Sequence, residues 1–157
     1  MSTLPLALTS TGNTEIPRRL MPDTMACVLE AWVSVSARND AEISDGTPIG
    51  QAFDRLTAPN VVALGINCTK PEFISGLISH AGASRPLAVY PNAGRTWDAV
   101  GRRWLDPGVD RFPKDLLSAW LNAGVRLLGG CCGLGYDHIT DVRELLQSRK
   151  DGHENAV

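Results

Sequence analysis

Hydrophobic positions along this chain recur with two periods, and together they predict strands that alternate with helices. Residues 32–36 alternate apolar and polar side chains and are rich in strand-forming types. The continuous apolar run at 61–66 is typical of a strand buried on both faces of a parallel sheet. Two shorter strands are predicted at 86–90 and 125–128. Helical spacing of apolar residues after each strand predicts helices at 47–56, 69–78, 114–122 and 137–146.

Four strand–helix repeats indicate an α/β fold in which helices cover a parallel sheet. Thr47 is expected to cap the first helix and Pro48 to open it. Gly124 is expected directly after the third helix. The third strand and its helix are separated by a long polar segment, whose Trp97 and Trp104 either pack or form a platform for a substrate.

The two ends of the chain have weaker patterns. Leu4 to Leu8 is compatible with a short strand, and residues 9–14 are polar and predict a turn. Pro17 and Pro22 limit any helix between them. The tail at 150–157 is charged and is expected to fray.

Composition narrows the classes of function. The chain has 157 residues, a net charge of −2 and 43% hydrophobic residues, which fits one soluble globular unit. Such a charge gives no reason to expect nucleic acid or an anionic membrane as a partner, and no apolar run approaches the ~18–20 residues of a membrane span. The first residues lack the basic region of a signal peptide, so we expect a cytoplasmic protein with reduced cysteines. Cys27, among apolar neighbours, is expected to be a buried and inert thiol.

The other three cysteines fall just after predicted strands. Cys131 and Cys132 lie within Gly129-Gly130-Cys131-Cys132-Gly133, and Cys68 follows the strand at 61–66. Adjacent cysteines seldom bridge each other, because disulfide geometry is demanding. Flanking glycines reach positive φ at little cost, so the backbone can bend until both sulfurs reach one ion. Three sulfurs leave one position of a zinc tetrahedron open, which is typical of catalytic zinc sites.

The placement of these residues supports the same chemistry. Active sites of (β/α)₈ barrels lie on the loops that follow the carboxyl ends of the strands. Cys68, Cys131 and Cys132 are all predicted at such positions. The sequence therefore predicts a zinc-thiolate site that binds and activates a ligand in its fourth position.

At these residues the chain resembles the zinc-dependent homocysteine S-methyltransferase family. The resemblance covers about residues 30–146 and implies a (β/α)₈ TIM-barrel fold, with Cys68, Cys131 and Cys132 as zinc ligands. The matching segments occur in the family's order: Trp32-Val33-Ser34-Val35-Ser36, Ser44-Asp45-Gly46-Thr47-Pro48, Gly65-Ile66-Asn67-Cys68-Thr69, Tyr90-Pro91-Asn92-Ala93-Gly94 and Gly129-Gly130-Cys131-Cys132-Gly133.

The chain departs from the family in length. A barrel takes ~250 residues, and the matched part corresponds to the second half of family members. We therefore expect a C-terminal half-barrel of about four βα units at 30–149, with residues 1–29 as a remnant of the fourth strand and helix. The family's segment Glu-Thr-Ile-Pro is matched only in part by Thr14-Glu15-Ile16-Pro17. This partial match suggests Glu15 as a contact to the substrate amine. Asn67 either stabilises its loop or contacts substrate.

The resemblance implies a methyltransferase of methionine biosynthesis. Homocysteine would bind zinc as a thiolate and take a methyl group from a sulfonium donor, S-methylmethionine or S-adenosylmethionine. One alternative is a non-catalytic zinc-binding half-barrel remnant. Another is a thiol-redox protein using Cys131 and Cys132, although this pair lacks Cys-Xaa-Xaa-Cys spacing. An open half-barrel exposes sheet edges, so we expect self-association or a missing N-terminal half as partner.

Several other polar residues have two interpretations each. Tyr90 and Asn92 either form a turn or lie at the rim of the site, and Ser34 or Ser36 can line the interior. The histidines are expected at the surface or at helix starts rather than as ligands, since three sulfurs suffice; they are His80, His138 and His153.

Overall fold

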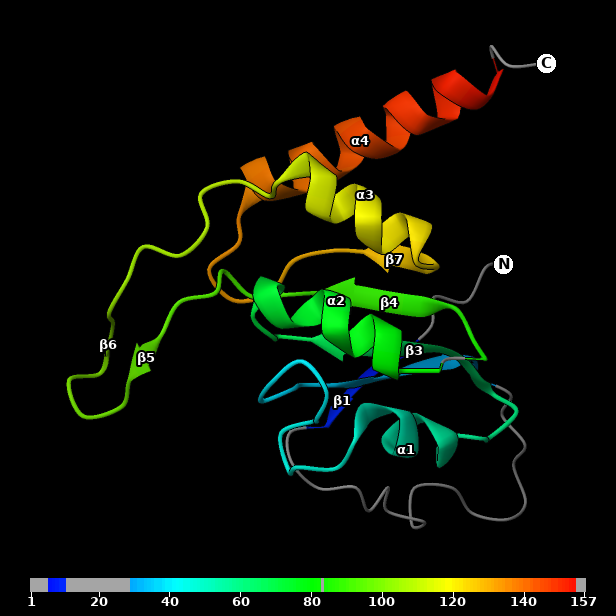
Figure 1. Ribbon diagram of the computed structural model, residues 1–157, viewed down its shortest axis with the longest axis horizontal. Helices are drawn as coiled ribbons and strands as arrows, with labels where there is room; N and C mark the ends of the chain where they lie inside the picture. The colour runs from blue at the N-terminus through cyan, green and yellow to red at the C-terminus, as the bar shows by residue number, and fades with distance from the viewer. Residues whose placement is uncertain (1–5, 11–28, 83, 155–157) are drawn as a thin grey trace.

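Five parallel strands form one open, twisted sheet in a computed structural model that describes residues 6–10, 29–82 and 84–154 (Figure 1). Neighbouring strands in the order β1-β2-β3-β4-β7 are hydrogen-bonded to each other. All four pairings are parallel, so the carboxyl ends of the strands meet along one edge of the sheet. The strands are β1 (Leu6–Ser10), β2 (Ala31–Val35), β3 (Val61–Asn67), β4 (Leu87–Tyr90) and β7 (Val125–Leu128).

Each of the last four strands of this sheet is followed by a helix, as the apolar pattern predicts. The helices are α1 (Ile49–Asp54), α2 (Pro71–His80), α3 (Lys114–Asn122) and α4 (Tyr136–Glu154). Gly124 adopts φ +99° directly after α3, which confirms its predicted place beyond the helix. None of the helices in the described ranges is both long and apolar enough to cross a membrane.

The hydrophobic core lies between the helices and one face of the sheet. Trp120 of α3 is its largest fully buried side chain and donates from Nε1 to Ser75 Oγ of α2 over 3.1 Å. Successive strand residues point to opposite faces, so alternate residues of β3 and β4 face the helices. The core includes Ile49, Phe53, Leu64, Ile66, Ile74, Leu77, Val89, Leu117 and Trp120.

The opposite face of the sheet carries a buried polar contact. Ser34 of β2 is fully buried and accepts a hydrogen bond from the Tyr90 hydroxyl of β4. Gly65 lies on β3 between them, where an added Cβ would be only 2.0 Å from Ser34 Oγ. A glycine is therefore needed at this position of the central strand. Ser34 fulfils the expectation of an interior serine, whereas Ser36 Oγ contacts Ser44 Oγ at 2.7 Å in an exposed position.

The connection between β4 and α3 forms an arm that projects from the sheet (Figure 1). Its tip is a small antiparallel hairpin of β5 (Trp97–Asp98) and β6 (Arg103–Trp104). At its base, Arg95 Nε donates to the Pro107 carbonyl over 2.6 Å and the Thr96 N–H donates to Asp106 Oδ2 over 2.9 Å. The apolar pattern does not predict this hairpin, because strands of two residues are too short to show a hydrophobic period.

Four sequence-based expectations need correction. The short N-terminal strand runs from Leu6 to Ser10, so the predicted turn cannot begin at residue 9. Thr47 does not cap α1: Pro48 occupies the cap position, and no side chain caps this helix. The helix after β3 begins at Pro71 rather than at residue 69, and Lys70 is its cap residue.

The fourth correction concerns the charged tail. α4 continues to Glu154 instead of fraying from residue 150. Arg149 of α4 donates to Asn122 Oδ1 and to the Ser118 carbonyl, and these contacts attach the helix to α3.

Candidate metal centre

Three cysteine side chains converge at the carboxyl edge of the sheet. Cys68 directly follows β3, and Cys131 and Cys132 follow β7, on the other side of β4. Cys68 Sγ lies 3.6 Å from Cys132 Sγ, and Cys131 Sγ lies 3.8 Å from Cys132 Sγ. All three sulfurs lie within 4.8 Å of one another. The structure thus brings together the three residues predicted as metal ligands, at distances far longer than the ~2.05 Å of a disulfide bond.

The backbone of Cys68 is in the left-handed region, with φ +46°. This conformation is unfavourable for a residue with a Cβ, so neighbouring groups must hold it. The Cys68 N–H donates to the Tyr90 carbonyl over 3.0 Å, and Asn92 Nδ2 donates to the Cys68 carbonyl over 2.9 Å. Such local strain is common at functional sites, where surrounding contacts fix a side chain in one direction.

The loop that carries the other two cysteines is attached to the same segment after β4. The Cys131 N–H donates to the Pro91 carbonyl over 2.8 Å, and the Cys132 carbonyl accepts from the Ala93 N–H over 2.9 Å. Gly133 has φ +78°, and an added Cβ there would lie 2.8 Å from Ala93 Cβ. Gly130, in contrast, does not adopt positive φ. Only the glycine after the cysteine pair therefore supplies the predicted backbone freedom.

Asn92 is the polar residue that connects the turn after β4 to the loop of Cys68. Its Nδ2 reaches the Cys68 carbonyl, its Oδ1 accepts from the Gly94 N–H over 2.8 Å, and its own N–H donates to the Thr69 carbonyl over 3.0 Å. Asn92 is therefore both a turn residue and a rim residue. The Tyr-Pro-Asn-Ala-Gly turn was the sequence signal for it, although the turn alone did not show what it would contact.

Asn67 lies at the end of β3, next to Cys68. Its side chain is 7% exposed, and its Oδ1 has no hydrogen-bond partner. A buried acceptor without a partner is costly in a folded protein. Asn67 therefore remains a candidate for contact with substrate. Glu15, the other predicted substrate contact, and Cys27 lie outside the described residues.

Among the side chains that the structure describes, neither His80 nor His138 joins the three sulfurs. His80 is exposed at the end of α2, and its Nδ1 contacts the Gly76 carbonyl at 2.9 Å. His138 lies in the first turn of α4, as expected of a residue at a helix start, but it is buried. His153 is among the last residues of α4. That none of the three is a metal ligand stays a prediction.

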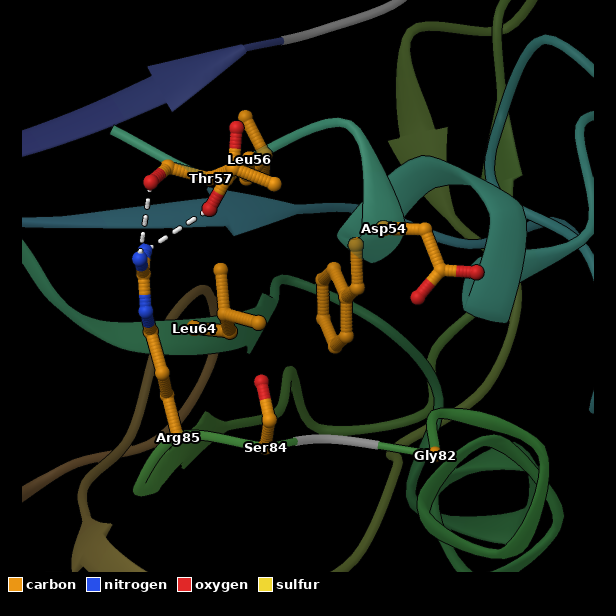
Figure 2. A pocket seen from close by; sticks show the side chains of 8 residues that line it. Asp54, Leu56, Thr57, Leu64, Gly82, Ser84 and Arg85 are labelled. Atoms are coloured by element: carbon orange, nitrogen blue, oxygen red, sulfur yellow. Dashed lines mark hydrogen bonds between the residues drawn. The ribbon is translucent and has the colours of Figure 1, made fainter. Parts of the chain in front are cut away.

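A cavity of about 100 Å³ lies at the opposite end of the sheet, between the segments that lead into β3 and β4 (Figure 2). Arg85 extends along it and donates from Nη1 to the Leu56 carbonyl over 2.7 Å and from Nη2 to the Thr57 carbonyl over 3.1 Å. The guanidinium is thus engaged with backbone of the chain itself. Residues at the amino ends of barrel strands usually serve stability, and we assign this cavity no part in the chemistry.

Sequence comparison shows that this chain is similar to known methyltransferases. The profile of the family described as Homocysteine S-methyltransferase matches residues 7–146. The homocysteine S-methyltransferase of Escherichia coli K12 is 42% identical over 106 residues, covering 65% of this chain and 34% of that protein. Homocysteine S-methyltransferase 2 of Arabidopsis thaliana is 33% identical over 147 residues, covering 86% of this chain and 44% of that protein. The chain therefore spans less than half the length of these relatives.

Solved structures show the same partial correspondence. The metallated form of the homocysteine methyltransferase MmuM from Escherichia coli aligns with a TM-score of 0.54 at 33% identity, over 76% of this chain and 35% of that one. Its apo form aligns with a TM-score of 0.57 at 34% identity, over 74% of this chain and 39% of that one. The likeness confirms the predicted fold class, so the open parallel sheet is part of a TIM-type barrel.

Proposed function

The chain belongs to the homocysteine S-methyltransferase family, and on that basis we propose that it binds zinc and carries the metal-binding half of a methyl-transfer site. Cys68, Cys131 and Cys132 would be the ligands. The observation that supports this proposal most strongly is the convergence of three sulfurs from two separate loops. Homocysteine would be the acceptor, and a sulfonium compound such as S-methylmethionine or S-adenosylmethionine would be the donor.

The three sulfurs fit a zinc ion by distance and by chemistry. Zinc–sulfur bonds of ~2.3 Å in a tetrahedron separate two sulfurs by about 3.8 Å. The two Sγ–Sγ distances of 3.6 and 3.8 Å agree with this spacing. Thiolates are ligands that zinc prefers, and three of them leave one position for a substrate. A crystal form of the Escherichia coli relative described as metallated adds support.

The chain's own residues would orient the reactants. Bound zinc would supply the acidity that keeps the homocysteine thiol deprotonated at neutral pH. The hydrogen bonds of Asn92 and Ala93 to the two cysteine loops would keep the sulfurs in place. The unpartnered Oδ1 of Asn67 could accept a hydrogen bond from the substrate amine, and Glu15 is the proposed second contact to it.

The methyl transfer itself needs no acid from the protein. The homocysteine thiolate forms a bond to the methyl carbon while the bond from that carbon to the sulfonium sulfur breaks. The electron pair stays on the donor sulfur, which leaves as a neutral thioether. The products are methionine and the demethylated donor, and orientation and exclusion of water are the tasks left to the fold.

Because the chain spans less than half of its relatives, complete activity requires the rest of a barrel. We infer that a complementary N-terminal half, covalent or separate, supplies the remaining strands. The alternative is a half-barrel that binds zinc without catalysis, and it keeps the same three-sulfur geometry. Reduced cysteines also suit a cytoplasmic location.

Two measurements test the proposal. Elemental analysis of protein purified without added zinc is expected to give about one zinc per chain, and Cys131→Ser should lose it. Absence of zinc from the reduced wild-type chain would refute the metal site. Methionine formation from homocysteine and S-methylmethionine then separates an enzyme from a remnant. Zinc binding without methionine, with or without an added N-terminal half, would support the remnant.

A further inference from the structure

His138 makes two hydrogen bonds whose directions fix its chemical state. Its Nδ1 accepts from the Gly135 N–H over 3.2 Å, and its Nε2 lies 3.0 Å from the Val109 carbonyl. A carbonyl can only accept and a backbone N–H can only donate. The imidazole is therefore neutral and carries its proton on Nε2.

These two bonds belong to a closed ring that is made of four hydrogen bonds and the stretch of chain from Cys132 to Gly135. The Val109 N–H donates to the Ala93 carbonyl over 2.9 Å, and the Ala93 N–H donates to the Cys132 carbonyl over 2.9 Å. Gly135, the first partner of His138, lies three residues after Cys132 in the chain. The ring thus runs from Cys132 to Ala93, to Val109 and to His138, and returns through Gly135.

We propose that His138 is a positioning residue that fixes the Cys131–Cys132 loop against the base of the arm. This inference rests on the proposed zinc site for its functional meaning, although none of the hydrogen bonds in the ring involves a sulfur atom. The side chain is only 9% exposed and packs edge-on against Phe112, with ring centroids 5.6 Å apart. Burial and this packing support the imidazole in the orientation in which both bonds form.

Helix capping alone does not account for this histidine. His138 is the third residue of α4, and a side chain at that position commonly accepts from the N–H of the cap residue. A side chain with an acceptor alone would suffice for that bond. The additional bond to the Val109 carbonyl needs a donor on the opposite side of the same side chain. A neutral imidazole offers an acceptor at Nδ1 and a donor at Nε2, on opposite sides of its rigid plane. The second bond links the cysteine loop to the arm.

The test uses three variants of the full chain that separate the two bonds. His138→Asn places an amide near Nδ1 and retains an acceptor for Gly135. His138→Gln places an amide near Nε2 and retains a donor for Val109. His138→Phe keeps the aromatic packing and loses both bonds. His80→Gln, on exposed His80 of α2, is the control for loss of a histidine.

The first readout is amide hydrogen exchange of the metal-free protein. The Ala93 N–H bonds to Cys132 and is not a direct partner of His138, so it reports on the ring rather than on a lost contact. We expect Ala93 to exchange faster in all three His138 variants, while Leu77 in the core of α2 exchanges as in wild type. A merely structural role would raise both rates together, through global unfolding.

The second readout is zinc affinity measured by competition with a chelator. Loss of both bonds is expected to weaken binding about 10–100-fold, with smaller losses for the two amide variants and none for His80→Gln. A wild-type chain that binds no zinc would refute the proposed metal site, and the Ala93 amide would still decide the role of His138. An Ala93 rate unchanged in His138→Phe overturns the ring. If that variant does not fold, wild-type rates in both His138→Asn and His138→Gln overturn it equally.

Discussion

At the scale of single residues, the backbone of Cys68 is the clearest sign of a built site. Its φ of +46° lies in a region that glycine occupies at no cost and other residues avoid. Two hydrogen bonds hold it in this conformation, one from its N–H to the Tyr90 carbonyl and one from Asn92 Nδ2 to its own carbonyl. The fold thus tolerates strain at the residue that must direct a sulfur toward the other two.

The strain at Cys68 predicts an unusual order of stabilities. In metal-free protein, Cys68→Gly should be more stable than Cys68→Ala by about 1 kcal/mol, because glycine removes the left-handed penalty. Both variants lack the thiol, so the comparison is independent of metal. Urea denaturation followed by tryptophan fluorescence measures the difference. Equal midpoints and slopes would show that the conformation of Cys68 carries no strain.

The close approach of β2 and β3 gives a second prediction. Gly65→Ala should lower the free energy of unfolding by about 1–3 kcal/mol, since the new methyl group would overlap buried Ser34. Gly135→Ala is the matched control, because an added Cβ there meets nothing within 4 Å. The same denaturation assay compares them. A loss at position 65 no larger than at position 135 would contradict the structure.

At the scale of elements, the β4–α3 connection differs most from an ordinary strand–helix loop. Such loops usually have 2–6 residues, whereas this one spans Pro91 to Pro113 and carries a hairpin. Its base is attached to the cysteine loop through Ala93, and its tip exposes Val100 and Leu105. The connection therefore links solvent-exposed apolar side chains to the candidate metal centre.

The carboxylate at the base of the arm should titrate at low pH. The Thr96 N–H stabilises ionised Asp106 and lowers the pKa of that carboxyl below its usual 3.8. Since the folded pKa is the lower one, the contact is complete above 3.8 and is lost as the pH falls through the folded value. The Thr96 amide shift, followed by NMR, should titrate with a midpoint below 3.8.

The matched variant for this titration is Asp106→Asn. Its amide oxygen can still accept from Thr96 but has no proton to bind in this range, so the Thr96 shift should no longer titrate. A Thr96 transition of unchanged midpoint in Asp106→Asn would assign the titration to another group.

The periodic pattern predicted the larger elements for clear physical reasons. The run at 61–66 became β3, which is buried on both faces as the continuous apolar pattern predicted. The run at 125–128 became β7 although Arg126 and Leu127 are exposed. The helix at 114–122 was placed correctly because Pro113 and Gly124 mark its two ends. The start of α1 was misplaced because Pro48 rather than Thr47 is its cap residue, while the Thr47 N–H donates to Asp45 Oδ1. Periodicity does not reveal such local hydrogen bonds. The length of α4 depends on contacts of Arg149 with α3, which are tertiary.

At the scale of the whole molecule, the described sheet has two free edges. β1 pairs only with β2, and β7 pairs only with β4, among the described strands. A closed barrel of this type has eight strands. Leu127 on β7 is 46% exposed, and α4, which packs against α3, exposes Ile139 and Leu146 to a similar degree. The β7 edge therefore offers unpaired backbone groups beside an exposed apolar side chain, which favours pairing with another chain.

The free β7 edge predicts concentration-dependent self-association of the chain as given. Leu127→Lys should reduce it, because a charge on an edge strand opposes strand pairing. Sedimentation velocity across a concentration series measures the change. Leu105→Lys adds the same charge to the arm, where Leu105 is 58% exposed, and should have less effect. Equal effects of both variants would show that net charge, rather than the edge, controls association.

The sequence predicted which cysteines meet, but not what holds them. Parallel topology brings the ends of β3 and β7 to one edge, so Cys68 and the Cys131–Cys132 pair could be placed together from the pattern alone. The conformation of Cys68, the bridging contacts of Asn92 and the ring through His138 depend mainly on backbone groups of separate loops. Backbone N–H and carbonyl groups are nearly the same at every residue, so hydrogen bonds between them across loops cannot be predicted from the sequence of side chains.

The segment that leaves β4 contributes no sulfur, yet both cysteine loops are bonded to it. Cys68 meets it at Tyr90 and Asn92, and the later pair meets it at Pro91 and Ala93. Changing the separation of the sulfurs is therefore a matter of altering four consecutive residues at the end of β4 and just after it. To accommodate a larger ion, or to change the distances between the three sulfur atoms, one would substitute residues 90–93 and retain every cysteine.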